Sequence, residues 1–372
     1  MTLTSDDLRF MSRALQLAER GLYTTHPNPR VGCVVVQAGQ VVGEGAHLRA
    51  GEAHAEVYAL RQAGQAAQGA TAYVTLEPCS HFGRTPPCAD ALVAAGVKRV
   101  VVAMRDPNPL VSGRGIQRLE AQGVQVDVGV LEAQARALNP GFIRRMETGQ
   151  PYVRVKLAMS LDGRTAMHSG ESQWITGSAA RADVQRWRAR SSAVITGIGS
   201  LLQDNPQMTV RDSALAEEGF LPQPLRVLLD SNLRVPLDAL WLHAQGERLV
   251  VCQQADAVKR AQLEALGVRV EVLPGQAGRI ELAALWSFLV EAYQVNEVLV
   301  EAGAELAGAC MAAEQVDELI VYLAPVLLGS EARPLLQWPL QSMAQARRLQ
   351  LLDQRFFDQD IRLIYQPITR KE

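Results

Sequence analysis

The sequence predicts two consecutive domains of the α/β class, and three features of the chain support this prediction. The chain has 372 residues, more than twice the length of an average domain of ~150 residues. Short apolar runs alternate with segments of helical periodicity, a pattern that favours an open sheet covered by helices on both faces. Helix-breaking residues at Thr148-Gly149-Gln150-Pro151 precede a new apolar run, so we place the domains at residues 1–148 and 150–372.

The first domain is expected to begin with an amphipathic helix over residues 8–20, because apolar residues from Leu8 to Ala18 recur on one face. Residues 31–36 form a continuous apolar run, which is typical of a strand buried on both sides. The remaining strands are predicted at residues 40–45, 72–76, 97–104 and 124–128, and the remaining helices at residues 53–64, 88–95, 115–122 and 132–145.

The second domain begins with a predicted strand at residues 152–158. Further strands are predicted at residues 193–196, 225–229, 248–252, 268–273, 297–301, 318–323 and 361–365, with helices at residues 179–190 and 282–292. The last two of these strands lack the intervening pattern of a simple strand–helix–strand repeat.

The composition excludes several classes of protein. The 37 basic and 39 acidic residues leave a net charge of -2 without any run of like charge, so no nucleic-acid-binding surface is expected. No apolar stretch approaches the ~18 residues of a membrane span, and the acidic, helix-forming start is unlike a signal peptide. Five cysteines in a chain of this length do not form a disulfide framework. We therefore expect a cytoplasmic protein that binds neither nucleic acid nor a membrane.

The strongest chemical signal is His54-Ala55-Glu56, followed by Pro78-Cys79 and then Cys88. One imidazole and two thiolates occupy three positions of a tetrahedral zinc ion and leave the fourth for water, whose pKa the ion lowers. Glu56, close to the metal but not bound to it, is placed to take a proton from water and pass it to a leaving amine. This order of residues follows the general signature of zinc deaminases.

Other interpretations of these cysteines remain open. Eight residues separate Cys79 from Cys88, where the general signature has two, and His81 could close the site as a fourth ligand of a structural zinc. Cysteines also serve as small core residues. That role suits the three cysteines in apolar or small-residue stretches better than the pair in the proline-containing loop; they are Cys33, Cys252 and Cys310.

The second domain lacks the usual nucleotide-binding signatures. Gly197-Ile198-Gly199 follows a strand but has no third glycine, and the segment from Gly303 to Gly308 lacks the lysine and hydroxyl residue of a P-loop. The strand at residues 297–301 nevertheless leads into Gly303 and a helix, whose first backbone N–H groups can hold a phosphate. A tight strand-to-helix turn would require the same glycine.

Several segments resemble one known family. THPNPRVGCVVV, HAEVYAL and VTLEPCSHFGRTPPCADAL resemble the deaminase domain of the bifunctional riboflavin-biosynthesis deaminase–reductases. KLAMSLDGRTA, GESQWITG, DNPQMTVR, VEAGAELAGA and VDELIVYLAPVLLG resemble their reductase domain. The resemblance implies a cytidine-deaminase-like three-layer domain followed by a dihydrofolate-reductase-like domain. It also implies deamination of a diaminopyrimidine ribosyl phosphate, then NADPH-dependent reduction of the ribosyl side chain to ribityl.

The same resemblance assigns roles to individual residues. It makes His54, Cys79 and Cys88 ligands of one zinc ion and Glu56 the proton donor and acceptor. It places NADPH against Ala158, Trp174, Ser200, Asp204, Ser231, Gly303, Ala304, Glu305, Leu306, Ala307, Gly308 and Ala309. It places the substrate of the reductase against Ser172, Arg188, Met208, Arg211 and Glu301. The family also leads us to expect a homo-oligomer.

The residue types alone leave alternatives at several of these positions. Asn28 could hydrogen-bond a pyrimidine edge or only form a turn. Asp204 is the best candidate for an acid of the reductase, or it caps a helix. Arg188 suits a phosphate but lies in an arginine-rich helix that could be solvated, and Trp174 could belong to the core. Lys156 could neutralise phosphate or face solvent. His47, His81 and Arg84 are further candidates near the metal.

Three other functions are weighed against this one. A tRNA-base deaminase disagrees with the balanced charge and the long spacing between the cysteines. A second domain that only binds a nucleotide and regulates the first would bind without turnover. A zinc-stabilised scaffold would unfold when its metal is removed.

Overall fold

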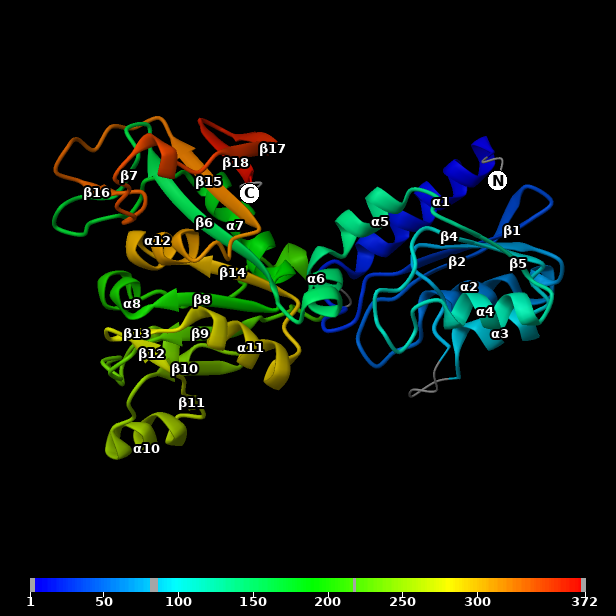
Figure 1. Ribbon diagram of the computed structural model, residues 1–372, viewed down its shortest axis with the longest axis horizontal. Coiled ribbons are helices and arrows are strands. Elements are labelled where there is room, and N and C mark those ends of the chain that lie inside the picture. Colours follow the sequence, from blue (N-terminus) through cyan, green and yellow to red (C-terminus); the bar gives the residue numbers. More distant parts are fainter. Residues whose placement is uncertain (1–3, 81–85, 217–218, 369–372) are drawn as a thin grey trace. The chain divides into compact units, whose positions relative to one another are not determined.

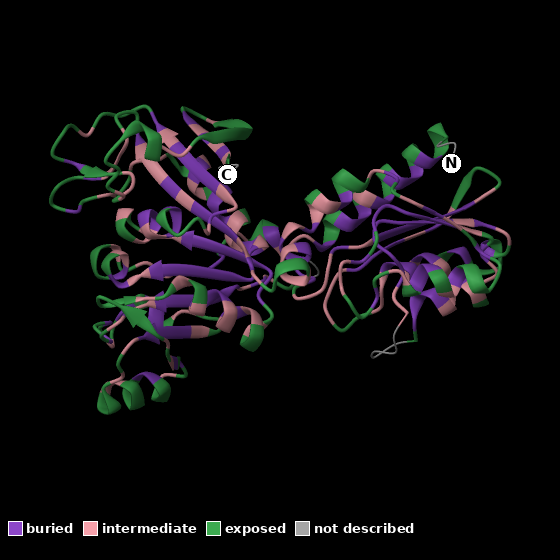
Figure 2. Cartoon of the chain, viewed as in Figure 1, coloured by how far each residue is buried: buried purple, intermediate pink, exposed green. Residues whose placement is uncertain are grey.

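The computed structural model describes residues 4–80, 86–216 and 219–368, and it divides into two compact units, Met1–Gln150 and Pro151–Glu372. Each unit is built on one main β-sheet with helices on both faces (Figure 1). The central strands of both sheets are buried, whereas the outward faces of the helices are exposed (Figure 2). Among the described residues, no helix has the length and apolar character needed to cross a membrane.

The sheet of the first unit has five strands in the order β2-β1-β3-β4-β5. β1 is antiparallel to both of its neighbours, whereas β3, β4 and β5 run parallel. The apolar run predicted as a doubly buried strand forms β1, where Cys33 and Val34 are inaccessible to solvent. The strands are β1 (Gly32–Gln37), β2 (Gln40–Ala46), β3 (Thr71–Val74), β4 (Arg99–Val102) and β5 (Gln125–Val128).

Helices cover both faces of this sheet, as the alternating pattern predicts. The apolar sides of α1, α5 and α6 pack on one face around Met11 and Phe142. The apolar sides of α2, α3 and α4 pack on the other face around Ala59 and Leu92. The helices are α1 (Ser5–Ala18), η1 (Glu19–Gly21), α2 (Ala55–Ala63), η2 (Gly64–Ala67), α3 (Cys88–Ala94), α4 (Arg114–Ala121), α5 (Glu132–Leu138) and α6 (Pro140–Thr148).

The prediction of one continuous helix over residues 132–145 is wrong, because α5 ends before Asn139 and α6 begins at Pro140. Proline has no N–H to continue the hydrogen-bond ladder of α5, but it suits the first turn of a helix. The Asn139 side chain accepts from the Arg30 N–H (2.8 Å) and donates to the Arg30 carbonyl (2.9 Å). These two bonds attach the junction between α5 and α6 to the segment that leads into β1.

The sheet of the second unit has nine strands in the order β11-β10-β9-β8-β14-β6-β15-β18-β17. The seven strands from β11 to β15 are parallel, and the last two are antiparallel. The strands are β6 (Tyr152–Ser160), β8 (Ala193–Gly197), β9 (Leu225–Leu229), β10 (Arg248–Cys252), β11 (Arg269–Val272), β14 (Glu297–Glu301), β15 (Glu318–Ala324), β17 (Leu349–Phe357) and β18 (Asp360–Pro367). Two small sheets pair β7 (Arg164–Ala166) with β16 (Arg333–Pro334) and β12 (Gly275–Gln276) with β13 (Arg279–Ile280).

Helices also cover both faces of this second sheet. The core around Trp286 and Met311 lies under α11 and α12, and the core around Val184 and Trp241 lies under α7 to α10. The helices are α7 (Ser178–Arg190), α8 (Ile198–Asp204), η3 (Ser213–Leu215), α9 (Leu240–His243), α10 (Ala257–Ala265), α11 (Leu282–Tyr293), α12 (Ala304–Ala312) and η4 (Met343–Gln345).

The parallel strands of the second unit all end at the same edge of the sheet. β8 runs directly into α8 at this edge, and β14 leads through Ala302 and Gly303 into α12 (Figure 1). The carboxyl edge of a parallel sheet is where ligands commonly bind in open α/β folds.

Candidate active sites

Three potential metal ligands converge in the first unit. His54 immediately precedes α2, Cys79 follows β3, and Cys88 is the first residue of α3. His54 Nδ1 lies 3.2 Å from Cys88 Sγ and 3.6 Å from Cys79 Sγ, and all three ligand atoms lie within 4.8 Å of one another. The loop between the cysteines therefore returns the second thiol to the first, so its length does not prevent a shared site.

The Cys79 thiol favours its ionised form. Hydrogen bonds from the Cys88 thiol and the His54 ring, opposed by burial, lower the pKa of Cys79. The Cys79 sulfur also accepts from the Cys88 backbone N–H at 3.3 Å. One imidazole and two sulfurs make a donor set that zinc prefers, and they leave a fourth tetrahedral position without a ligand from the described residues. His81, the alternative fourth ligand, and Arg84 lie outside the described residues.

Glu56 is the second residue of α2, and its side chain is buried. The residue is 3% exposed, and its Oε2 atom makes no hydrogen bond within the described part of the chain. Burial raises the pKa of Glu56 to about 7. A buried carboxyl group with an unused oxygen beside a metal-ligand cluster can accept a proton and return it, as a general acid–base requires.

Asn28 is held by a buried histidine. The Asn28 amide nitrogen lies 3.1 Å from His47 Nε2, while His47 Nδ1 lies 3.1 Å from the Ala53 carbonyl. His47 must therefore donate through Nδ1 and accept from Asn28 through Nε2. Burial lowers the pKa of His47, which favours this neutral form. The arrangement orients the Asn28 amide and exceeds what a simple turn needs, and the His47 ring packs edge-on against His54.

Glu77 is a residue of this site whose role the sequence did not indicate. Its carboxylate is 3% exposed, and it accepts four backbone N–H bonds, from Asp106 (3.2 Å), Gly113 (2.9 Å), Gly115 (2.9 Å) and Ile116 (3.3 Å). Gly115 fits here only as glycine, because a Cβ atom would lie 2.0 Å from the Pro78 carbonyl oxygen. Glu77 therefore ties the segment before Cys79 to the start of α4.

The second unit contains a large pocket at the carboxyl edge of its sheet. Its volume is about 1490 Å³, above the ~300–1,000 Å³ typical of a pocket for one small ligand. The pocket therefore has room for two ligands side by side.

Most of the predicted cofactor and substrate residues of this unit line the pocket. They are Ala158, Ser172, Trp174, Arg188, Ser200, Asp204, Met208, Arg211, Ser231, Glu301, Gly303, Ala304, Glu305, Leu306 and Ala309. Two predicted residues do not line it. Ala307 is fully buried in the core, and Gly308 lies against the backbone of Gln337.

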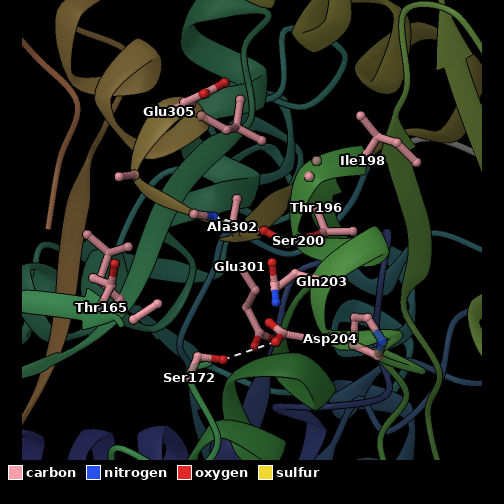
Figure 3. Close-up of a pocket in the computed structure, with 18 of the residues that line it drawn as sticks. Thr165, Ser172, Thr196, Ile198, Ser200, Gln203, Asp204, Glu301, Ala302 and Glu305 are labelled. Atoms are coloured by element: carbon pink, nitrogen blue, oxygen red, sulfur yellow. Dashed lines mark hydrogen bonds between the residues drawn. The ribbon is translucent and has the colours of Figure 1, made fainter. Parts of the chain in front are cut away.

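The pocket has two polar regions. Near one end, the Ser172 hydroxyl donates to Asp204 (3.0 Å) close to Glu301, as Figure 3 shows. Farther along, the Ser200 hydroxyl accepts from the Gly303 N–H (3.0 Å), which precedes α12. The labelled side chains of Ser200, Ala302 and Glu305 follow one another away from Glu301 (Figure 3).

Arg188 is buried and paired. The alternative that it lies on a solvated face of the arginine-rich helix is therefore wrong. Its guanidinium makes two bonds to the Glu301 carboxylate, at 2.6 and 3.0 Å, and a third to the Thr209 carbonyl. Burial opposes ionisation of Glu301, but Arg188 holds its pKa below the ordinary value. Lys156 is also buried, 3.9 Å from Glu301, and burial lowers its pKa. Arg211 makes no ion pair among the described residues, so it is the better candidate for a phosphate.

Trp174 is a pocket residue and not a core residue. Its side chain is 68% exposed, and the Arg181 guanidinium lies over its ring at 4.4 Å. An exposed aromatic face at a pocket rim can stack on a planar ring of a ligand.

Comparison with known proteins identifies the family. Residues 4–104 match the cytidine and deoxycytidylate deaminase zinc-binding region, and residues 151–363 match the RibD C-terminal domain. The riboflavin biosynthesis protein RibD of Escherichia coli is 50% identical over 95% of this chain and 98% of its own length. The Haemophilus influenzae protein of the same name is 47% identical over 99% of both chains. The chain belongs to the RibD family.

Solved structures agree with this assignment. The chain superposes on Acinetobacter baumannii RibD with a TM-score of 0.92 at 50% identity, covering 98% of this chain and 99% of the other. It superposes on a Thermotoga maritima diaminohydroxyphosphoribosylaminopyrimidine deaminase/5-amino-6-(5-phosphoribosylamino)uracil reductase with a TM-score of 0.85 at 31% identity, with the same coverage. The predicted pair of domains, cytidine-deaminase-like and reductase-like, is therefore confirmed.

Membership of the RibD family also confirms the predicted activity. The chain is a bifunctional enzyme of riboflavin biosynthesis with a zinc-binding deaminase domain and a reductase domain that uses NADPH. The cluster of His54, Cys79 and Cys88 fits the metal, and the pocket of the second unit fits a dinucleotide beside a substrate.

Proposed function

We propose that the first unit deaminates a diaminohydroxyphosphoribosylaminopyrimidine and that the second reduces the resulting 5-amino-6-(5-phosphoribosylamino)uracil. These are the compounds named for the Thermotoga maritima relative. The observation that carries the proposal is the coexistence in one chain of a His–Cys–Cys cluster beside a buried carboxyl group and a pocket large enough for two ligands.

In the deaminase site, the ligands would be His54, Cys79 and Cys88. A zinc ion bound there supplies Lewis acidity that lowers the pKa of water to near neutrality. Glu56 takes the proton of the attacking water and delivers it to the departing amine, so one water is consumed and one ammonia released. Asn28, oriented by His47, hydrogen-bonds an edge of the pyrimidine.

In the reductase site, NADPH bound in the pocket would supply a hydride for the ribosyl C1 carbon. Asp204, held by Ser172, supplies the proton that accompanies reduction, while Glu301 binds hydroxyl groups of the sugar. The Arg188 guanidinium fixes the Glu301 carboxylate, and Arg211 binds the sugar phosphate. The Gly303 turn at the start of α12 would offer backbone N–H groups to the cofactor pyrophosphate, and Trp174 would stack on a planar ring of a ligand at the rim.

The two half-reactions test these assignments separately. Without NADPH, the enzyme should release ammonia from the diaminopyrimidine, and Glu56→Gln should stop the release. With the deaminated uracil and NADPH, the Glu56→Gln variant should oxidise NADPH at the wild-type rate, whereas Asp204→Asn should be slow. Loss of both half-reactions in either variant would contradict the assignment of one site to each unit.

We further propose that the chain forms a homo-oligomer through β17, the last strand of the large sheet. An edge strand offers unpaired backbone groups to another chain. On β17 this edge carries exposed apolar side chains, among them Leu351, Leu352 and Phe356, the last 67% exposed. Phe356→Lys should shift the protein to a smaller species in sedimentation velocity. Val258→Lys, at an exposed position on α10, serves as the control, and an equal shift in both variants or in neither would contradict the proposal.

The remaining expectations about partners and compartment stay proposals. We propose that the enzyme acts in the cytoplasm on small molecules, without nucleic acid or membrane partners. The balanced charge of the chain and its five free cysteines, four of them buried, support this. Fractionation of expressing cells, with ammonia release as the readout, tests the compartment.

A further inference from the structure

Helix α7 presents to the reductase pocket a buried glutamine to which the sequence assigned no role. Arg181, Gln185 and Arg188 follow one another at intervals of four and three residues, so they share one face of α7, and all three line the pocket. Arg181 lies over the Trp174 ring, and Arg188 is engaged by Glu301. Gln185 lies between them and is 9% exposed, so its amide must find its partners in the protein or in a ligand.

One end of the Gln185 amide is fixed by a backbone hydrogen bond. The Arg211 N–H donates to Gln185 Oε1 at 2.8 Å. Because a backbone N–H can only donate, the atom that faces it must be the amide oxygen, and the amide nitrogen must be at the other end. Within the described part of the chain, Gln185 Nε2 makes no hydrogen bond. The amide nitrogen of this pocket residue is therefore left for a ligand.

The backbone that carries Arg211 is held firmly as well. Gln223 Oε1 accepts from the Val210 N–H (3.0 Å), and Gln223 Nε2 donates to the Val210 carbonyl (2.8 Å), so one side chain engages both backbone groups of the residue before Arg211. One residue earlier, the Thr209 carbonyl accepts from Arg188 (3.1 Å). Three consecutive residues, up to and including Arg211, are therefore held by side chains from outside their own segment.

The Arg211 guanidinium and the Gln185 amide nitrogen together suit a phosphate. Both residues line the pocket, and Arg211 makes no ion pair among the described residues. The guanidinium supplies positive charge and a fork of N–H donors, and the amide adds a neutral donor for a further phosphate oxygen. Because the amide and the Arg211 backbone are already fixed in the free chain, little conformational freedom is lost when the phosphate binds.

The place of these two residues in the pocket indicates which phosphate they meet. Arg188, one turn after Gln185 on α7, bonds Glu301, at the end of the pocket where the ribosyl group is proposed to react. Burial raises the pKa of Glu301, but the positive charges around it, Arg188 and Arg211 among them, lower it, so Arg211 lies at this end too. The pyrophosphate position proposed at Gly303 is farther along the pocket. The phosphate is therefore that of the substrate sugar.

We propose that Gln185 binds the sugar phosphate of the reductase substrate through Nε2, beside Arg211, in addition to supporting the Arg211 backbone through Oε1. The inference rests on the proposed function, in which the second unit reduces 5-amino-6-(5-phosphoribosylamino)uracil and Arg211 binds its phosphate. Gln185 contacts the phosphate and not the reacting carbon, so its loss raises KM and leaves kcat nearly unchanged.

Two substitutions at Gln185 separate contact with the phosphate from support of Arg211. Gln185→Met keeps the approximate size of the side chain and removes both ends of the amide. Gln185→Glu keeps an oxygen for the Arg211 N–H, but it replaces the amide nitrogen with a carboxylate oxygen that is ionised at pH 8 and repels a phosphate. The reductase KM should rise about tenfold in Gln185→Met and about a hundredfold in Gln185→Glu. A milder effect of Gln185→Glu than of Gln185→Met would overturn the proposal, because Gln185 would then only support Arg211.

The substrate without its phosphate supplies the second readout. NADPH oxidation is followed with the deaminated uracil and with its dephosphorylated counterpart, and the ratio of the two kcat/KM values measures what the phosphate contributes. This ratio should fall about tenfold in Gln185→Met and about a hundredfold in Gln185→Glu. Gln262→Met and Gln262→Glu, at an exposed position on α10 outside the pocket, are the matched controls and should keep the wild-type ratio.

The outcomes separate the inference from the function on which it rests. A wild-type chain that oxidises no NADPH with the phosphorylated uracil overturns the proposed reductase function itself. An active wild type whose Gln185 variants both keep the wild-type ratio overturns only the assignment of Gln185. Variants that lose activity on both compounds also contradict that assignment, because kcat should be nearly unchanged.

Discussion

Replacing Glu77 with Gln should loosen the segment that connects β4 to α4 and thereby the metal-ligand cluster. Each carboxylate oxygen accepts two backbone N–H bonds: Oε1 from Gly115 and Ile116, and Oε2 from Asp106 and Gly113. The side chain is 3% exposed, so water cannot replace these bonds in the folded state. In Gln one oxygen becomes an amino group, which donates and cannot accept, so two of the four bonds are lost.

The size of the effect follows from these bonds. A hydrogen bond to a charged group contributes about 1.5–3 kcal/mol, so the loss of two destabilises the segment by at least ~3 kcal/mol. Because ~1.4 kcal/mol is a factor of ten, local opening should become about a hundredfold more frequent. Hydrogen exchange followed by mass spectrometry on a peptide spanning residues 105–121 of the zinc-loaded chain measures this directly. Zinc loss to a chelator should accelerate as well, because Cys79 lies two residues from Glu77.

Glu120→Gln is the matched control, because Glu120 lies on the exposed side of the same helix. It should leave both exchange and zinc loss unchanged. An exchange rate in the Glu77→Gln variant within about threefold of wild type would refute the reasoning, because it would mean that the two lost bonds contribute less than ~1 kcal/mol together.

Three further predictions concern other residues. Glu56→Gln should lower ammonia release by about 10²–10⁴-fold while the zinc content stays the same; an active variant would rule out Glu56 as the proton shuttle. Arg211→Ala should raise the reductase KM about tenfold or more and leave ammonia release unchanged, whereas equal losses would mean that Arg211 acts through folding. Burial raises the pKa of Asp7, but hydrogen bonds from Arg99 and Thr4 hold it well below the ordinary value of 3.8. The stability that ionised Asp7 contributes is therefore present at neutral pH and lost as the pH falls below about 3.8. The melting temperature of wild type should fall more steeply than that of Asp7→Asn below pH 4, and parallel curves would contradict this.

Features that depend on short stretches of sequence were predictable. The run at residues 31–36 was predicted as a doubly buried strand, and residues 32–36 of it lie in β1. The pattern around His54, Cys79 and Cys88 indicated a shared site, and the structure brings the three ligand atoms together. His54 and Cys88 lie at the starts of α2 and α3, and Cys79 lies in the loop between β3 and α3.

Features that depend on distant partners were not predictable. Arg188 and Glu301 are 113 residues apart, and helical periodicity alone left Arg188 equally compatible with a solvated face. The four partners of Glu77 lie 29 to 39 residues away. β17 was missed because its two adjacent leucines, Leu351 and Leu352, break the alternation of a half-buried strand at a register shift against β18. The turn after β9 and the β12–β13 hairpin are joined through Gln253, which contacts Ser231 and Arg279 far apart in the sequence.

The central claim is that one chain performs the two reactions in sequence, and one assay tests it most directly. The purified, zinc-loaded enzyme receives the undeaminated pyrimidine ribosyl phosphate and NADPH, and the near-ultraviolet absorbance of NADPH is followed together with ammonia. We predict that NADPH oxidation follows ammonia release and stops in the Glu56→Gln variant, and that adding the deaminated uracil to that variant restores it. NADPH oxidation that continues in the Glu56→Gln variant without ammonia release would contradict the claim, because the second unit would then accept a substrate that the first had not produced.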